Sequence, residues 1–227
     1  FDGSVYRCRM TLKALKKQLN EGFMEVKRGC MIAVSAISNI GDKILLSNGE
    51  EICYTKRKKK ALREELQKKQ ELMIAKISKK KLPLTPEEYG KYYKICDSLP
   101  FAFTDIEMVF NEEKKAVDWI FRYGNEALAT LEKLPLDKMI GNSFSSLFSN
   151  MDSKWLQSYE RATLYGETLE IMDYSPEIHT NLKIICFPTF PGHCGCILFN
   201  ADRMKSIGEE NHLVRLAAVA LKSNPTI

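Results

Sequence analysis

The chain has 227 residues, enough for one large or two modest domains, and its 44% hydrophobic and 28% charged residues are ordinary for a globular protein. No apolar run approaches the roughly 20 residues that span a bilayer, and no charged-then-apolar leader opens the sequence, so we expect a cytoplasmic protein with no membrane partner. Residues 1–81 hold 20 Lys and Arg against 9 Asp and Glu, whereas residues 82–227 hold 14 against 20. This contrast predicts two domains with different partners, the first of which faces a polyanion.

The sequence offers no arrangement of catalytic or metal-ligating side chains. Its seven cysteines are an odd number and stand mostly among apolar neighbours, so we expect buried thiols and no disulfide framework. His193-Cys194-Gly195-Cys196 has no second ligand pair elsewhere and is interpreted as a turn that enters a strand. Without a phosphate-binding loop, a nucleophile elbow or a kinase signature, the sequence predicts no enzyme, no cofactor and no metal.

Residues 1–60 are predicted to form one short helix and several short strands. Leu12, Leu15 and Leu19 recur at helical spacing with lysines on the other face, which predicts an amphipathic helix over 12–20. Alternating and apolar stretches predict strands over 5–10, 23–27, 30–34, 43–47 and 50–55, and Ile37-Ser38-Asn39-Ile40 leads through Gly41-Asp42 to the fourth of them. Asn48-Gly49 predicts a type I′ hairpin turn, in which both central residues take a positive φ.

Cations gather at two points of this segment. Lys56-Arg57-Lys58-Lys59-Lys60 follows the predicted hairpin, and Lys27-Arg28 stands at a break between two predicted strands. Such cations can displace counterions from phosphates and so bind nucleic acid without sequence preference. The simpler alternative is a solvated surface and a helix entry.

The order of these strands and turns resembles the second half of a LytTR-type DNA-binding domain. The resemblance rests on Phe23-Met24-Glu25-Val26-Lys27-Arg28-Gly29-Cys30-Met31-Ile32-Ala33 and on an Asn-Gly hairpin that ends in Ile52-Cys53-Tyr54-Thr55-Lys56-Arg57-Lys58. It covers residues 1 to about 65 and implies that loops between strands enter the major groove of DNA. The DNA contacts that it implies are Lys27, Arg28, Lys56, Arg57 and Lys58.

Among these residues, Arg28 and Arg57 are the candidates for base readout, because a guanidinium can donate two parallel hydrogen bonds, and the lysines are the candidates for phosphate. The sequence departs from the family pattern at four positions: Lys27 replaces the usual His, Gly29 a Ser, Cys30 an aromatic residue and Ala33 a frequent Asn. The family's first hairpin is expected upstream of Phe1, so the domain over 1–60 is expected to be incomplete at its N-terminus.

Residues 61–85 are predicted to be a linking helix and a linker. Leu62, Leu66, Met73 and Ile77 follow one another at steps of four, seven and four, a heptad-like pattern that is too short to establish a coiled coil. The helix either joins two subunits of a homodimer or packs on one of the domains. Lys79-Lys80-Lys81 and Pro83 indicate the domain boundary.

Residues 86–202 are predicted to begin with a helix capped at Thr85-Pro86-Glu87-Glu88. Two strands (101–110 and 116–123), several short helices, a longer helix (153–165) and three strands (168–174, 182–189 and 195–199) follow. This order resembles a PAS domain, and the resemblance is carried by Leu99-Pro100-Phe101-Ala102, Tyr123-Gly124-Asn125-Glu126-Ala127, Ile140-Gly141-Asn142-Ser143-Phe144, Trp155, Tyr159, Gly166 and Gly195-Cys196-Ile197-Leu198-Phe199.

The resemblance implies a five-stranded antiparallel sheet with helices and a role in sensing or dimerisation. Two alternatives stay open for the interior: a small apolar or amphipathic ligand between sheet and helices, or a fully packed core. The residues expected to line a pocket are Phe103, Ile120, Trp155 and Ile185. His179 and His193 are expected at the surface, and a final helix is expected within 203–227.

The sequence as a whole therefore predicts an α+β protein with a mostly-β LytTR-like domain, a linking helix and a PAS-like domain. The expected function is that of a transcriptional regulator, which binds DNA as a homodimer while the PAS-like domain senses a signal or mediates dimerisation. One alternative is the regulatory part of a larger signalling protein, such as a nucleotide cyclase or a kinase. Another is a protein-interaction module without DNA binding.

Overall fold

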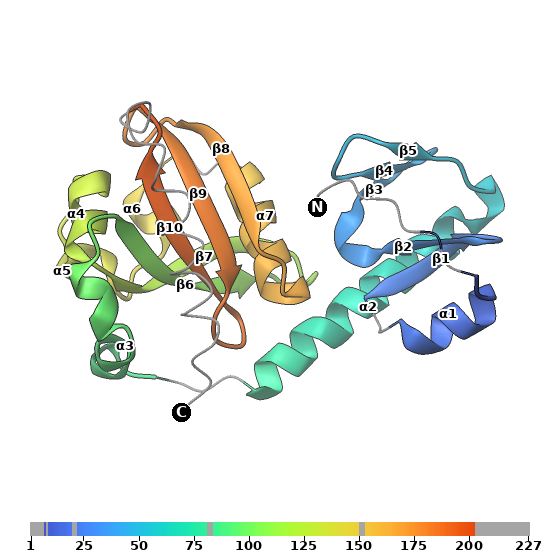
Figure 1. Ribbon diagram of the computed structural model, residues 1–227, viewed down its shortest axis with the longest axis horizontal. Coiled ribbons are helices and arrows are strands. Elements are labelled where there is room, and N and C mark those ends of the chain that lie inside the picture. Colours follow the sequence, from blue (N-terminus) through green and yellow to red (C-terminus); the bar gives the residue numbers. More distant parts are fainter. Residues whose placement is uncertain (1–6, 8, 20–21, 81–83, 150–152, 203–227) are drawn as a thin grey trace. The chain divides into compact units, whose positions relative to one another are not determined.

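A computed structural model describes residues 7, 9–19, 22–80, 84–149 and 153–202 (Figure 1). Contacts within the chain separate two units, Phe1–Leu72 and Met73–Ile227, so the division falls inside the segment that was expected to link them. Of the strand predicted over 5–10, residues 5, 6 and 8 lie outside the described residues, and residues 7, 9 and 10 are not in a strand. The helix predicted within 203–227 lies outside the described residues.

The first unit combines a short helix with two small antiparallel sheets. Helix α1 is capped by Thr11, whose hydroxyl accepts a hydrogen bond from the Ala14 N–H at 3.2 Å. Strand β1 alternates buried and partly exposed residues, as expected for a strand with one face on a core. The elements are α1 (Leu12–Gln18), β1 (Phe23–Lys27) paired with β2 (Cys30–Ala33), and a sheet of β3 (Ile37–Ile40), β4 (Ile44–Leu46) and β5 (Glu51–Ile52).

The hairpin between β4 and β5 differs from the predicted type I′ turn. Gly49 has a φ of 85°, but Asn48 is not among the residues with positive φ. The Leu46 N–H donates to the Glu50 carbonyl at 2.8 Å, which closes a three-residue loop. Such loops need the left-handed conformation at their last residue only, and glycine adopts it without a steric cost. The Asn-Gly pair therefore indicated a hairpin correctly, but the turn type was wrong.

Helix α2 (Lys59–Lys80) follows a short 3-10 helix at Lys56–Lys58. Its most buried side chains are Leu62, in the first unit, and Ile74, in the second. Leu66, Met73 and Ile77, the other members of the predicted seam, are partly buried. The helix was predicted correctly, whereas pairing of two subunits along it stays a prediction.

The second unit is a five-stranded antiparallel sheet with the spatial order β7-β6-β10-β9-β8 (Figure 1). Along the chain, four helices of the described residues lie between β7 and β8. Helix α3 has the predicted capping box, in which the Thr85 N–H donates to the Glu88 carboxylate at 2.7 Å. The elements are α3 (Pro86–Tyr92), β6 (Ala102–Phe110), β7 (Ala116–Gly124), α4 (Glu126–Glu132), α5 (Leu136–Met139), α6 (Phe144–Leu147), α7 (Ser153–Tyr165), β8 (Leu169–Ser175), β9 (Thr180–Pro188) and β10 (His193–Asn200), with a 3-10 helix at Lys94–Ser98.

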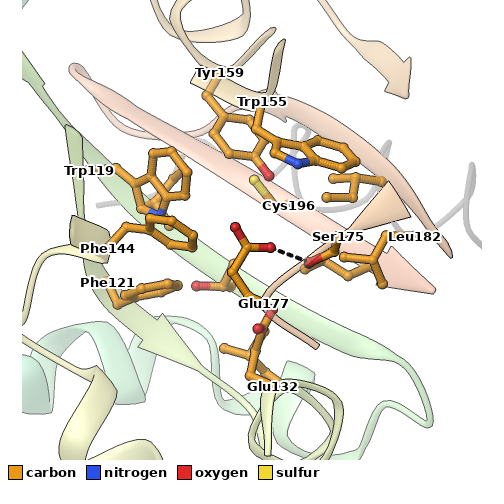
Figure 2. Close-up of a pocket in the computed structure, with 15 residues that line it drawn as sticks. Trp119, Phe121, Glu132, Phe144, Trp155, Tyr159, Ser175, Glu177, Leu182 and Cys196 are labelled. Atoms are coloured by element: carbon orange, nitrogen blue, oxygen red, sulfur yellow. Dashed lines mark hydrogen bonds between the residues drawn. The ribbon is translucent and has the colours of Figure 1, made fainter. Parts of the chain in front are cut away.

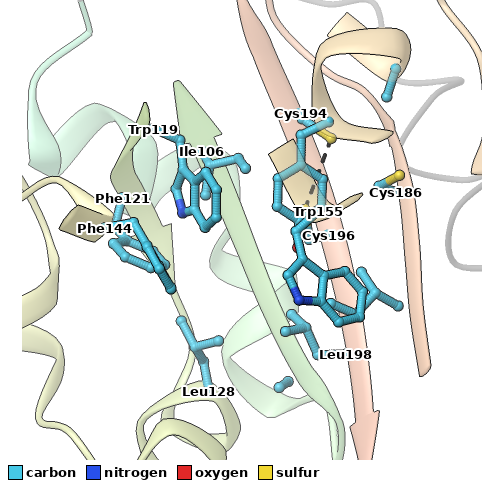
Figure 3. Packing of buried hydrophobic residues seen from close by; sticks show 14 of the residues in the cluster. Ile106, Trp119, Phe121, Leu128, Phe144, Trp155, Cys186, Cys194, Cys196 and Leu198 are labelled. Atoms are coloured by element: carbon cyan, nitrogen blue, oxygen red, sulfur yellow. Dashed lines mark hydrogen bonds between the residues drawn. The ribbon is translucent and has the colours of Figure 1, made fainter. Parts of the chain in front are cut away.

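The central strands of this sheet are buried on both faces, so successive residues enter two different cores. On one face Ile106, Cys196 and Leu198 pack with side chains from helices α4 to α7 (Figure 3). On the other face Phe103 and Ile197 pack with aromatic side chains of α3. Because side chains of a strand alternate between faces, a shift of one residue moves a position from one core to the other.

Asn125 joins the start of β6, the end of the 3-10 helix and the first turn of α4. Its Oδ1 accepts the N–H groups of Phe103 and Leu128, both at 3.0 Å. Its Nδ2 donates to the carbonyls of Cys96 and Phe101 at 3.0 and 2.9 Å. The side chain is almost fully buried, so water could not satisfy these four backbone groups if the side chain were removed.

We expect Asn125→Ala to lower the free energy of unfolding of the second unit by about 3 kcal/mol or more, because buried backbone groups lose their partners. Urea unfolding followed by tryptophan fluorescence measures this, since both tryptophans of the chain, Trp119 and Trp155, lie in the second unit. Asn142→Ala is the matched control, because Asn142 makes one exposed side-chain hydrogen bond, to the Lys138 carbonyl. Equal unfolding midpoints for the two variants would contradict the role assigned to Asn125.

Candidate functional site

The first candidate site is a basic surface of the first unit, which we define as Lys27, Arg28, Lys56, Arg57 and Lys58. All five side chains are exposed. Lys27 ends β1 and Arg28 precedes Gly29, whose φ of 79° makes the tight turn into β2 possible. The other three form the 3-10 helix before α2. Within the described part of the chain, none of the five belongs to an ion pair.

Glu25 of β1 shows that the two parts of the basic surface are close in space. The pKa of its carboxyl lies below the ordinary value, first because Lys16 donates a hydrogen bond to it and also because the charge of Lys58 is near. Glu25 stands two residues before Lys27 on the same strand. Figure 1 shows β1 and β2 alongside the first turns of α2. The 3-10 helix therefore lies near the β1–β2 pair, as the predicted DNA-contact residues require.

The neighbouring cations are already engaged and are less available to a ligand. Lys59 lies 3.4 Å from the Asp42 carboxylate and Lys60 lies 3.9 Å from that of Glu64. The Arg63 Nε donates to the Ile40 carbonyl at 2.9 Å, which fixes α2 to β3. Of the five consecutive cations that stand out in the sequence, Lys59 and Lys60 thus form ion pairs. The other three form none within the described part of the chain, although the charge of Lys58 acts on Glu25.

The second candidate site is a cavity of about 40 Å³ in the second unit, between the sheet and the helices (Figure 2). Five aromatic rings contribute to its wall, from β7, α6 and α7. No Lys, Arg or His stands among its lining residues in the described part of the chain. The residues that line it are Thr104, Ile106, Trp119, Phe121, Leu128, Glu132, Phe144, Trp155, Tyr159, Ser175, Glu177, Leu182, Ile184, Cys196 and Leu198.

Of the four residues that the sequence suggested for a pocket, only Trp155 lines this cavity. Phe103 and Ile185 are buried in the core on the opposite face of the sheet, and Ile120 is partly buried outside the lining. The strands were located correctly, but the residue chosen on each strand was displaced by one position. Phe103, Ile120 and Ile185 are all apolar, so hydrophobicity alone does not show which face of each strand meets the cavity.

Sequence reasoning missed two carboxylates that enter the cavity, Glu132 at the end of α4 and Glu177 between β8 and β9 (Figure 2). The Ser175 hydroxyl donates to Glu177 Oε2 at 2.7 Å, while Glu177 Oε1 is buried and has no hydrogen-bond partner among the described residues. Burial, and then the negative charge of Glu177, raise the pKa of Glu132 to about 7. Neither residue belongs to a motif of the sequence, so no local signal singles it out.

His193, expected at the surface, is 1% exposed and belongs to a polar network on the other face of the sheet. Its Nδ1 lies 2.6 Å from Asp105 Oδ1, and its Nε2 lies 3.3 Å from the Tyr89 hydroxyl. The Tyr93 hydroxyl donates to Asp105 Oδ2 at 2.7 Å. The network ties α3 to β6 and β10, which explains why a histidine is buried there. His179, the other histidine in question, is exposed as expected.

Comparison with known proteins concerns the first unit. A family model described as the LytTr DNA-binding domain matches residues 1–67, so a LytTR DNA-binding domain is present there, as the sequence predicted. The match ends within α2. A search of curated proteins gives no match to the chain. In the described part of the chain, every helix is too short or too polar to cross a bilayer.

We expect Glu132→Gln to be more stable than the wild type at pH 8 by about 1 to 3 kcal/mol and equally stable near pH 4.5. The reason is that the carboxyl titrates near 4.5 when unfolded but near 7 when folded, so its ionisation costs the folded state stability as the pH rises between these values. Urea unfolding at a series of pH values measures the difference.

Glu112→Gln serves as the control, because Glu112 is exposed in the turn between β6 and β7 and does not line the cavity. The Glu112 variant should keep the pH dependence of the wild type. Parallel stability curves for the wild type and Glu132→Gln would show that Glu132 titrates normally.

Proposed function

We propose that the chain is a DNA-binding transcriptional regulator in which the basic surface of the LytTR domain contacts duplex DNA and the second unit is a PAS-type sensory or dimerisation domain. The observation that carries the proposal is the position of the basic surface within a matched DNA-binding domain. Its five cations are exposed and without ion pairs among the described residues.

The cost of this arrangement to the folded protein supports a binding role. The N-terminus of a helix already carries a positive partial charge, and acidic residues in the first turn usually balance it. Helix α2 has no acidic residue in its first turn and follows three cations directly. This repulsion destabilises the free protein, and it becomes an attraction when a phosphate binds at the same place.

The arginines and the lysines of the basic surface suit different parts of the DNA. Arg28 stands in the β1–β2 turn and Arg57 in the middle of the 3-10 helix, where each guanidinium can enter a groove and donate two hydrogen bonds to a guanine. Lys27, Lys56 and Lys58 supply point charges suited to phosphate oxygens. We therefore assign base readout to the two arginines and positioning on the DNA backbone to the three lysines.

The element order of the second unit supports its assignment as a PAS-type domain. Two strands, short helices, one longer helix and three strands follow one another in the order on which the sequence resemblance rests, and they form one five-stranded sheet. The cavity between this sheet and the helices offers a place for a signal molecule. Homodimerisation through α2 would place two basic surfaces on one DNA site.

The proposal is tested by selecting bound duplexes from a random pool and then measuring their affinity for variants at two salt concentrations. Arg28→Ala and Arg57→Ala should each weaken binding to a selected duplex by about 1 to 3 kcal/mol and relax the base preference at one position. Lys56→Ala should weaken binding to selected and unselected duplexes alike and lower the salt dependence by about one counterion.

Lys138→Ala is the matched control, because Lys138 is an exposed cation of α5 in the second unit. It should leave both affinity and salt dependence unchanged. Affinity that does not respond to salt, or the absence of any enriched sequence, would contradict the proposed function.

A further inference from the structure

We propose that the cavity of the second unit binds a small organic cation, an alkylammonium ion, between the carboxylates of Glu132 and Glu177 and the surrounding aromatic rings. The inference rests on the proposed sensory role of this unit and names the chemical class of its signal. It replaces the expected apolar or amphipathic ligand with a positively charged one.

The first argument is the charge that the cavity leaves unbalanced. Glu177 Oε1 is buried without a hydrogen-bond partner among the described residues, and a second carboxyl, that of Glu132, enters the same space. A buried acceptor without a partner costs free energy, and a negative charge in apolar surroundings costs more. Among the described residues, those that line the cavity include no cation that could offset this cost. A positively charged ligand would supply the missing partner.

The titration of Glu132 points the same way. Its pKa rises to about 7 because it is buried and because Glu177 is negatively charged. A cation bound between the two carboxyls would reverse the second of these effects. Binding should therefore favour the ionised form of Glu132 and strengthen as the pH rises from 6 to 8.

The second argument is the aromatic wall. The Trp119 ring centroid lies 4.4 Å from that of Phe144 and 5.1 Å from that of Tyr159, where the two planes meet at 87°. Phe121 and Trp155 are the other two aromatic residues of the lining (Figure 2). The faces of such rings carry partial negative charge and attract organic ammonium ions strongly when water is excluded. A hydrated metal ion would prefer oxygen ligands to these rings.

The size of the cavity limits the ligand. A volume of about 40 Å³ is far below the several hundred Å³ of cavities that hold drug-sized molecules. An ammonium nitrogen with a few methyl groups, free or at the end of a longer molecule, is the chemistry that this space accommodates. Both carboxyls could then approach the charge from one side while the rings surround the methyl groups.

The test uses the intrinsic fluorescence of the full chain, because Trp119 and Trp155 are its two tryptophans and both line the cavity. The chlorides of methylammonium, dimethylammonium, trimethylammonium and tetramethylammonium are titrated at constant ionic strength set with sodium chloride. tert-Butanol serves as a neutral molecule of similar shape. We expect a saturable fluorescence change and a higher melting temperature with at least one of the ammonium ions, and neither with tert-butanol nor with sodium chloride.

Two variants probe the carboxyls separately. Glu177→Gln and Glu132→Gln should each weaken ammonium binding at pH 8 by at least about tenfold, because an amide keeps the shape but lacks the charge. Glu112→Gln, on the exposed turn, should bind like the wild type. Urea unfolding of each variant confirms that it is folded, and if one of the cavity variants fails to fold, the other decides.

A lack of saturable binding by all four ions would overturn the inference, as would equal binding of tert-butanol or unchanged binding in both folded cavity variants. DNA affinity measured on the same samples separates this inference from the proposed function. Intact DNA binding without ammonium binding would contradict the cation site but leave the proposed DNA-binding function standing. Ammonium binding that leaves DNA affinity unchanged supports the cation site and removes the sensory role.

Discussion

The burial of β6 on both faces is the constraint on which the second unit depends. Thr104 and Ile106 line the cavity, while Asp105, between them, accepts a hydrogen bond from Tyr93, which follows α3, and lies 2.6 Å from His193. One strand thus holds an apolar core with a small cavity on one side and a buried polar network on the other. Any change in the position of β6 would be felt on both faces, because close-packed interiors transmit displacement.

Strand β6 therefore contacts both the cavity on one face of the sheet and the polar network with α3 on the other face. Asn125 fixes the start of β6 to the 3-10 helix and to α4, and the α4 helix carries Glu132 at its end. A ligand that drew Glu132 toward Glu177 would pull on α4, and the hydrogen bonds of Asn125 would transmit this displacement to β6. The polar network on the far face offers α3 a discrete set of hydrogen bonds that such a shift could alter.

In the first unit the main constraint is electrostatic, because repulsion among its surface cations lowers the stability of the folded domain. Three cations precede the positively polarised start of α2, and two more occupy the adjacent β1–β2 turn. The folded domain tolerates them because they are exposed, where water and salt screen their repulsion. A phosphate backbone would convert the same arrangement into binding energy, so the placement of the charges is consistent with the proposed function.

The sequence by itself determined the elements and the nature of the first domain. Local signals sufficed for this: the cap at Thr85, the Asn-Gly loop, the strands around Phe103 and Ile184, and the order of strands and turns near the N-terminus, whose resemblance to a LytTR domain the family match confirms. Only the tertiary structure decided which face of each strand meets the cavity, that His193 is buried against Asp105, and that Glu132 and Glu177 enter one space. The physical reason is that helix caps and turns act over a few residues, whereas these juxtapositions join side chains far apart in the chain, on strands that carry apolar residues on both faces.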